Sequence, residues 1–568
     1  MDLGGFGSFA PGFFQTRYSP RPESVIIIGK KMAKNRPRIL FSSAFKPFGE
    51  ADTLYSRIDS KIELFHNQIT KYQGVFSPRI EYNTFGLHAI ANNIETPSLV
   101  LDFPTLARFI QEVQKGYDYV GIGAIIPNFN KVKRMVEETR RHSPKSKIII
   151  GGFCAMIENV EKVLDVDYIC RGEGISFMRE LLGESPEFKF RQPLVYGKTR
   201  WTLGVPFFWG DYRPCIIASL GCPYGCDFCS PSHFFGKRHI KFLKTGEEIF
   251  NEIVRLKKIY KTDSFGILGD DNFLVDEERA EGLREIMVKS GLQVNLFIFA
   301  SADLVARWEP EKLAEMGIYN IWIGRESKFA PYLKNRDVNM KELIDNLRKV
   351  GIKVILSSIL LFAYHNKTNI WEDIEDHLAC SPAFSQFAFY SPVPGTPFYE
   401  RLKEERRLLL NIPLEEWHAF KQPWFIHPEF KLWEAEKVQE RAYLEDFYRL
   451  GPSIVRMIRD EVIGYLNMHN SQNKRLRKRA EFLARSFPVY RSVLKGCLYL
   501  AKSQEQKEFI KEVISELEQV IGKTKIWEEI GGLGLYGFGR AWELRSKFLS
   551  DAVQPGTKIS YYSGDIKD

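Results

Sequence analysis

Cysteine is scarce in this sequence, and its scarcity excludes a disulfide-stabilised protein. The chain has 568 residues and only eight cysteines, too few for a disulfide framework. No basic stretch followed by a long apolar run and a cleavage site begins the chain, and no segment approaches the ~20 apolar residues that span a bilayer. We therefore expect a cytoplasmic protein with no signal peptide and no transmembrane segment. Five cysteines are scattered singly, at Cys154, Cys170, Cys215, Cys380 and Cys497.

A strong excess of one charge is also missing. Lys and Arg number 80 against 71 Asp and Glu, a net charge of +9. Over this length the surplus permits an anionic partner but does not require one. The basic run KRLRKR (474–479) lies within a helical pattern and is interpreted as a solvated face, so no nucleic-acid partner is evident. With 44% apolar and 27% charged residues, the composition is typical of a globular protein of several domains.

The first half of the chain alternates short β-branched runs with helical stretches. This pattern predicts a parallel, doubly wound sheet, in which ligands bind at the carboxyl ends of the strands. Three of the strands end in glycines, which let a backbone approach a ligand closely; tight strand-to-helix turns would need glycine as well. The glycines are Gly121 and Gly123, Gly151 and Gly152, and Gly172 and Gly174. The predicted strands are 38–43, 98–103, 117–126, 147–153 and 166–174.

A second α/β series follows. Six strand–helix repeats fit an open, partial barrel better than a complete barrel of eight, and the active sites of such barrels lie at the carboxyl ends of the strands. After residue 400 the pattern becomes helical, and the final ~18 residues resemble a polar tail. The predicted strands are 215–220, 264–269, 294–300, 319–324, 353–362 and 385–392. The predicted domains are a tail (1–37), a Rossmann-like domain (38–200), a barrel (201–400) and a helical C-terminal region (401–568).

Three cysteines lie close together, with the spacing Cys222-x3-Cys226-x2-Cys229. They directly follow the predicted strand 215–220, which places them on a loop at the mouth of the barrel. Three thiolates on one short loop can each bind a different iron of a cubane cluster, so that the fourth iron lacks a protein ligand. An iron that is open in this way can bind a substrate or cofactor.

Zinc is the alternative occupant. A closed structural zinc site needs four ligands, and His233 or His239 could supply the fourth. Zinc modules usually supply their ligands as two pairs from separate turns, so the spacing favours the cluster over zinc, and both over thiols that bind nothing.

The stretch CPYGCDFC (222–229) resembles the cluster-binding motif of the radical S-adenosylmethionine (SAM) superfamily. The resemblance implies a [4Fe-4S] cluster on the three cysteines, with SAM bound at the open iron. An electron from the cluster would cleave SAM and yield a 5′-deoxyadenosyl radical that abstracts hydrogen from the substrate. Phe228 matches the aromatic residue that lies near the adenine in that superfamily.

Three further stretches resemble the same superfamily. In LGDDNF (268–273), Asp270 and Asp271 match the position that meets the methionine amino group, although a solvated turn or a helix cap would also explain them. In IGRESK (323–328), Glu326, with Ser327 behind it, matches the position that binds ribose hydroxyls. The stretch SPVPGTPFYE (391–400) matches a rigid loop that marks one branch of the superfamily.

A Rossmann-like domain before the barrel resembles the cobalamin-binding branch of the superfamily. Many members have Asp-x-His-x-x-Gly after the first strand, where the histidine ligates cobalt. Here the stretch reads SSAFKPFGEAD (42–52) and has no histidine, and His66 and His88 are interpreted as ordinary residues. We expect either cobalamin without a histidine lower ligand or a domain that has lost the cofactor.

The resemblance implies a radical SAM enzyme that acts on an unactivated carbon, with cobalamin-dependent methyl transfer as the favoured chemistry. A cyclase or rearrangement enzyme without cobalamin is the second candidate, and a non-catalytic zinc or iron–sulfur interaction protein is the third. The first domain has no second cysteine trio, which argues against a transfer-RNA methylthiolating enzyme. We expect a small-molecule or lipid-like substrate and a reductant such as flavodoxin or ferredoxin. No catalytic residue is identified beyond the cofactor positions.

Overall fold

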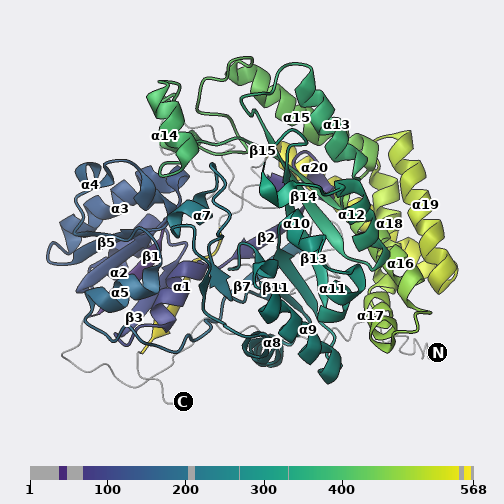
Figure 1. Cartoon of the computed structure of the whole chain (residues 1–568), viewed down its shortest axis with the longest axis horizontal. Coiled ribbons are helices and arrows are strands. Elements are labelled where there is room, and N and C mark those ends of the chain that lie inside the picture. The colour runs from purple at the N-terminus through teal and green to yellow at the C-terminus, as the bar shows by residue number, and fades with distance from the viewer. Residues whose placement is uncertain are drawn as a thin grey trace, which may run out of the picture.

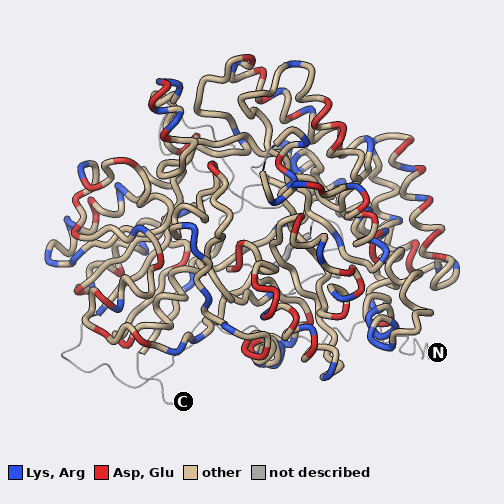
Figure 2. Tube along the Cα trace, in the orientation of Figure 1, with Lys and Arg blue, Asp and Glu red and all other residues tan. Residues whose placement is uncertain are grey.

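A computed structural model of the chain describes residues 38–47, 68–201, 212–267, 269–330, 332–548 and 555–563. The predicted tail (1–37) and His66 lie outside the described residues. Figure 1 shows an α/β part at the left, a second sheet with its helices in the middle, and a group of C-terminal helices at the right. Figure 2 shows basic and acidic residues interspersed over all three parts.

The predicted parallel sheet of the first half is confirmed. Its five parallel strands have the order β3-β1-β4-β5-β6. Aliphatic side chains of β1, β4 and β5 fill the core on both faces, as expected for strands buried between helices. The strands are β1 (Ile39–Ser43), β3 (Ser98–Asp102), β4 (Tyr119–Gly123), β5 (Lys147–Gly151) and β6 (Tyr168–Ile169); the helices are α1 (Phe85–Asn92), α2 (Leu106–Val113), α3 (Phe129–His142), α4 (Val160–Val163) and α5 (Gly174–Leu181).

The predicted polar tail is wrong for the last described segment. Residues Lys558–Tyr562 form β16, which pairs antiparallel with β3 at the edge of the first sheet. The hydroxyl of Tyr562 lies 2.6 Å from Nδ1 of His88, whose Nε2 lies 2.6 Å from a carboxylate oxygen of Asp102. The end of the chain therefore returns to the first domain, and His88 has a structural role there.

The second half contains a five-stranded parallel sheet in the order β11-β12-β13-β14-β15. The predicted strand at 215–220 is interrupted. Cys215 bridges Gly266 of β11 in parallel, but β9 (Ser219–Leu220) turns away and pairs antiparallel with β10 (Ile240–Lys241). The six-stranded partial barrel therefore stays a prediction. The strands are β11 (Ser264–Ile267), β12 (Asn295–Phe299), β13 (Ile318–Glu326), β14 (Lys353–Leu360) and β15 (Phe384–Phe389). Helix α8 (Gly246–Tyr260) precedes β11, and the helices that follow the strands include α9 (Glu277–Ser290), α10 (Ala302–Val305), α11 (Pro310–Met316), α12 (Met340–Lys349), α13 (Asn369–Ala379) and α14 (Pro397–Glu404).

A small antiparallel sheet that the sequence did not indicate joins the two halves. It consists of β2 (Pro78–Tyr82), β7 (Tyr196–Trp201) and β8 (Tyr212–Pro214). Ile80 of β2 and the preceding Ile69 pack against Ile355 and Phe384 of the second sheet. The long segment after β1 therefore contributes to the core of the second half.

The C-terminal region is helical from Leu432 to residue 548, as predicted, but residues 405–431 contain only the short 3-10 helix Leu414–Glu416. The basic run 474–479 is not simply a solvated face: Arg475 and Arg479 are buried and donate hydrogen bonds to the carbonyl oxygens of Glu315 and Val294 (2.9 and 2.7 Å). None of the helices in the described ranges has the length and apolar character of a membrane span. The helices are α15 (Leu432–Leu450), α16 (Ser453–Met468), α17 (Lys474–Ala484), α18 (Phe487–Leu500), α19 (Gln504–Ile521) and α20 (Ile526–Phe548).

Candidate active site

The three clustered cysteines line one cavity. They lie on the loop between β9 and α7 (Ser230–Phe234), and each is partly buried. The cavity has a volume of about 160 Å³, and its wall also includes Asp271 and Lys334. The loop begins at Gly221, whose positive φ (+78°) and close approach to the carbonyl oxygen of Arg238 leave no room for a side chain.

Burial keeps the three thiols protonated in the absence of a ligand. It raises the pKa of Cys222 and Cys226, and it raises the pKa of Cys229 to about 12. The ammonium group of Lys334 opposes this shift at all three thiols. A ligand that binds thiolates here must therefore displace protons, which is the behaviour of a metal or a metal cluster.

Neither histidine considered as a zinc ligand lies on the wall of the cysteine cavity, and one ring nitrogen of each is hydrogen-bonded. Nε2 of His233 donates to the carbonyl oxygen of Cys226 (3.0 Å). Nε2 of His239 lies 2.8 Å from the hydroxyl of Ser219 and 3.4 Å from a carboxylate oxygen of Asp270. Among the described residues, no three His, Cys, Asp or Glu side chains converge on a single ion.

The two predicted acidic residues have different surroundings. Asp270 is fully buried, ion-paired with Arg279 and in contact with His239, and it lies on the wall of neither cavity described here. Asp271 accepts a hydrogen bond from the backbone N–H of Gly221 (2.8 Å) and lines the cysteine cavity. Burial and the charge of Asp270 raise the pKa of Asp271 to about 6. Of the pair, Asp271 is the one placed to meet a ligand.

A larger cavity of about 550 Å³ lies between the two halves. Its wall comes from the first sheet and from the second half, including Leu220, Phe234 and Phe242. Asp271 lines this cavity too, so the two cavities meet at one carboxylate. All six glycines predicted to approach a ligand are on the wall: Gly121, Gly123, Gly151, Gly152, Gly172 and Gly174.

Internal packing also explains several of these glycines. A Cβ on Gly121 would lie 2.7 Å from the ring of Phe41, and one on Gly174 would lie 2.5 Å from the side chain of Ile90. Gly152 has a φ of +78° and lies against the backbone of Ala124. Gly151 differs, because a Cβ there would make only an ordinary contact at 3.7 Å. The glycines thus keep the cavity open and also allow close packing behind it.

The predicted ribose-binding element lies at the end of β13, but Glu326 is not exposed. Its φ of +61° falls at a shift in register between β13 and β14, and its buried carboxylate is ion-paired with Lys334. Burial lowers the pKa of Lys334, but the charge of Glu326 and the hydrogen bond to its carboxylate outweigh burial and raise it. The pair therefore fixes a charged ammonium group on the wall of the cysteine cavity.

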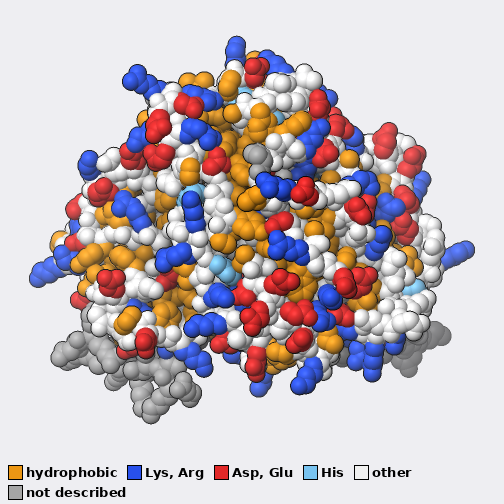
Figure 3. Space-filling view, viewed as in Figure 1, with side chains coloured by type: hydrophobic (Ala, Val, Ile, Leu, Met, Phe, Trp, Pro, Cys, Tyr) orange, Lys and Arg blue, Asp and Glu red, His pale blue; other side chains and the backbone are white. Residues whose placement is uncertain are grey.

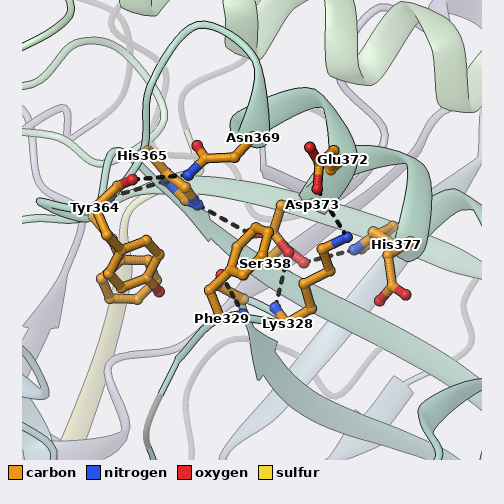
Figure 4. A network of polar contacts seen from close by, with 12 residues as sticks. Lys328, Phe329, Ser358, Tyr364, His365, Asn369, Glu372, Asp373 and His377 are labelled. Carbon is orange, nitrogen blue, oxygen red and sulfur yellow. Dashed lines mark hydrogen bonds and ion pairs between the residues drawn. The ribbon is translucent and has the colours of Figure 1, made fainter.

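A buried polar network holds the backbone that follows Glu326 (Figure 4). Asp373 of α13 accepts a hydrogen bond from the backbone N–H of Lys328 (2.8 Å) and pairs with Nη1 of Arg325 (2.9 Å). Nδ1 of His365 accepts from the N–H of Phe362 (3.1 Å), so the ring proton is on Nε2, which donates to Asp373 (3.1 Å). Burial opposes ionisation of Asp373, but His365 and Arg325 lower its pKa to about 2.

The same carboxylate also interacts with the hydroxyl of Ser327. Ser327 Oγ in turn accepts a hydrogen bond from the N–H of Phe329 (3.1 Å). Ser327 is buried, so the structure gives it a part in shaping this turn. Neither Glu326 nor Ser327 is on the wall of the cysteine cavity, although Gly324 of the same strand is.

Phe228 belongs to an aromatic cluster under the cysteine loop. Its ring packs edge-on against Tyr332 and Tyr390, with centroid distances of 5.4 and 5.7 Å. Both tyrosine hydroxyls donate to the carboxylate of Asp227, at 2.7 and 2.6 Å, and Arg401 lies 3.2 Å from it. Asp227 thereby ties the loop to the ends of the second sheet.

Sequence reasoning missed Asp227, Asn272 and Lys334. Asp227 lies inside the cysteine motif, and its charge at that position was the sequence feature that could have marked it as a functional residue. Asn272 lines the cysteine cavity, with its amide 3.9 Å from Sγ of Cys222, and it follows the aspartate pair directly. Lys334 lies in the short 3-10 helix Leu333–Asn335, and only the fold shows that it lines the cavity of the cysteines.

Comparison with known proteins finds distant relatives. No protein-family model matches the chain. The chain is 25% identical over 354 residues to bacteriochlorophyllide d C-12(1)-methyltransferase of Chlorobaculum tepidum. The match covers 58% of this chain and 75% of the relative. It is 28% identical over 206 residues to hopanoid C-2 methylase of Rhodopseudomonas palustris, a match that covers 34% of this chain and 38% of the relative. The curated relatives are covered over 38% to 75% of their length.

Among solved structures, the chain is similar to the radical SAM methyltransferase TsrM of Kitasatospora setae, which was solved with cobalamin and a [4Fe-4S] cluster. The TM-score is 0.49 at 13% identity, covering 79% of this chain and 99% of that one. The sequence relatives support the resemblance to radical SAM enzymes of the cobalamin-binding branch.

Proposed function

We propose that this chain is a radical SAM enzyme that transfers a methyl group, with the help of cobalamin, to an unactivated carbon. The observation that carries the proposal is the shared wall of two cavities. The cavity lined by the three cysteines and the glycine-lined cavity of about 550 Å³ both include Asp271. Cofactors held in the two cavities would therefore be neighbours, as methyl transfer that uses both requires.

The residues present fit the three groups. Cys222, Cys226 and Cys229 would hold a [4Fe-4S] cluster, because they supply three thiols to one cavity. SAM would bind beside it, and cobalamin would occupy the larger cavity, whose wall is largely apolar and glycine-rich. When bound, the cluster and SAM supply radical chemistry at an unactivated carbon, and cobalamin supplies a methyl carrier.

Side chains of this chain would orient the bound groups and would place a positive and an acidic group beside them. Lys334 places a positive charge against the cysteine cavity and suits a carboxylate of the ligand there. Asp271, whose pKa burial raises to about 6, suits an ammonium group and can hold or release a proton near neutral pH. Apolar side chains such as Phe234 and Phe242 exclude water from the larger cavity.

The lower face of a cobalamin in the larger cavity would have no histidine ligand among the described residues. The wall of that cavity includes no histidine. His88 is held by Asp102 and Tyr562 and is not on the wall. For the part of the chain that the structure describes, we infer a cobalamin without a histidine lower ligand. A cyclase or rearrangement enzyme of the same branch stays the second candidate, since one relative is an anaerobic magnesium-protoporphyrin IX monomethyl ester cyclase of Cereibacter sphaeroides.

The substrate and the reductant are also proposals. We infer an apolar small-molecule or lipid-like substrate, because one relative is a hopanoid C-2 methylase. A flavodoxin or ferredoxin would supply the electron.

Anaerobic reconstitution with iron and sulfide tests the proposal. We expect about four irons per chain, a brown absorbance, and 5′-deoxyadenosine when SAM and a reductant are added. Cys226→Ala should lose all three, and Cys380→Ala, which removes a buried thiol that does not line the cysteine cavity, should retain them. A wild-type chain that takes up zinc but forms no cluster and no 5′-deoxyadenosine would overturn the proposal.

A further inference from the structure

Helix α20 presents an apolar face to the solvent along its whole length. We call this face, made of six side chains, the α20 apolar face. Their spacing of three, four and seven residues puts most of them on one stripe of the helix. All six are between 46% and 78% exposed: Ile526, Trp527, Ile530, Leu533, Phe538 and Leu544.

The opposite face of α20 is already packed. A Cβ on Gly532 would lie 2.5 Å from the side chain of Lys495, and one on Gly496 would lie 2.9 Å from Leu535, so α18 and α20 approach each other closely at glycines. Leu535 is buried in the core of the C-terminal helices. A helix that is apolar on both faces is normally covered on both, so the α20 apolar face calls for an external partner.

Exposed basic side chains stand at both ends of the helix. Lys523 and Lys525 precede its first turn, and Arg545 and Lys547 lie in its last turn.

The acidic side chains of α20 are held in ion pairs within the chain. Glu528 pairs with Arg491 (2.8 Å) and Glu529 with Lys495 (3.0 Å), while Glu543 lies 2.8 Å from Arg540 and also pairs with Lys502. The partner of this surface should therefore be apolar in the middle and negatively charged around it.

A second copy of the chain fits this charge pattern poorly. An antiparallel pair of α20 helices would bring Lys523 and Lys525 of one copy against Arg545 and Lys547 of the other. A parallel pair would bring each of these residues against itself. Either arrangement places like charges together beside an apolar contact, which is unfavourable.

We propose that α20 lies flat on the surface of an anionic lipid bilayer, with its apolar face in the boundary between headgroups and acyl chains. Exposed apolar and aromatic side chains flanked by Lys and Arg are what a helix at this interface needs. About 34 Å of helix would lie in the plane of the membrane, at 1.5 Å per residue. The inference rests on α20 alone and requires none of the cofactors of the proposed function.

Vesicle sedimentation of the full-length chain tests this proposal. We expect the wild type to sediment with vesicles of phosphatidylglycerol and phosphatidylcholine and to bind pure phosphatidylcholine weakly, with binding reduced by salt. Ile530→Glu/Leu533→Glu should weaken binding to the anionic vesicles roughly tenfold or more. The matched control is Val254→Glu/Ile259→Glu on α8, where the two side chains are 44% and 47% exposed; it should bind like the wild type.

Three results would overturn the proposal. The first is a wild-type chain that does not sediment with anionic vesicles. The second is a loss of binding in the α8 control equal to that in the α20 variant. The third is a dimer, detected by light scattering, that Ile530→Glu/Leu533→Glu dissociates, because a second copy would then be the occupant. Thermal unfolding of each variant shows that it is folded, as expected for substitutions at exposed positions.

Discussion

At the scale of single residues, the ion pair between Lys334 and Glu326 holds an ammonium group on the wall of the cysteine cavity. Both groups are largely buried. Lys334→Met should destabilise the chain by roughly 3–5 kcal/mol, because the carboxylate of Glu326 is left without its partner. Lys334→Met/Glu326→Gln should recover most of that loss, since no buried charge then remains. Urea unfolding of the chain without cofactors measures both, and a double variant as unstable as the single one would contradict this account.

Asp373 gives the polar network of Figure 4 a pH dependence. Its folded pKa of about 2 is below the ordinary value of 3.8, because His365 and Arg325 outweigh burial. Its contribution, roughly 2 kcal/mol, is present above about pH 4 and is lost as the pH falls through the folded pKa. The difference in unfolding free energy between the wild type and Asp373→Asn should shrink between pH 5 and pH 2. A constant difference over this range would show that the pKa of Asp373 is not lowered.

The sequence was sufficient to predict residues whose type the chemistry of the site requires, namely the three clustered cysteines and the glycines at the strand ends. The cysteine spacing indicated one shared site, and the glycines indicated one shared wall; both sets do line single cavities. Asp270 and Asp271 could not be told apart, because the difference depends on Arg279, whose guanidinium reaches Asp270 only in the folded chain. Lys334 was not predictable for the same reason: its partner Glu326 is on a strand end, and the cysteines are about a hundred residues earlier.

At the scale of elements, the contact between α18 and α20 can be tested with two glycines of one helix. Gly532→Ala should destabilise the chain by about 1–3 kcal/mol, because its Cβ would lie 2.5 Å from the side chain of Lys495. Gly534→Ala should stabilise it by about 0.5–1 kcal/mol, because its Cβ meets nothing within 4 Å. Chemical denaturation measures both. Equal effects of the two substitutions would mean that α18 and α20 do not pack as described.

Elements with a clear hydrophobic period were predictable, and those that depend on distant partners were not. The buried strands β1, β4 and β5 and the long C-terminal helices follow their sequence patterns. The strand β16 has a short mixed pattern, and it forms because β3 offers an open edge more than 450 residues earlier. The break in the predicted strand 215–220 likewise depends on β10, which draws Ser219 and Leu220 away.

At the scale of the whole molecule, the two halves meet around the larger cavity, and β16 ties the end of the chain back to the first sheet. Figure 3 shows a surface on which charges of both signs are interspersed, with apolar side chains visible between them near the middle of this face. The central claim is that the larger cavity between the two halves holds cobalamin next to the cysteine loop.

Cobalamin bound per chain after anaerobic purification and loading, measured by its visible absorbance, tests this claim most directly. We predict close to one cobalamin per wild-type chain. Gly151→Ala should retain it and Gly151→Leu should lose it, because a small side chain at this position meets only an ordinary contact while a large one must enter the cavity. A wild-type chain that forms the iron–sulfur cluster but binds no cobalamin would contradict the claim and leave radical chemistry without a methyl carrier.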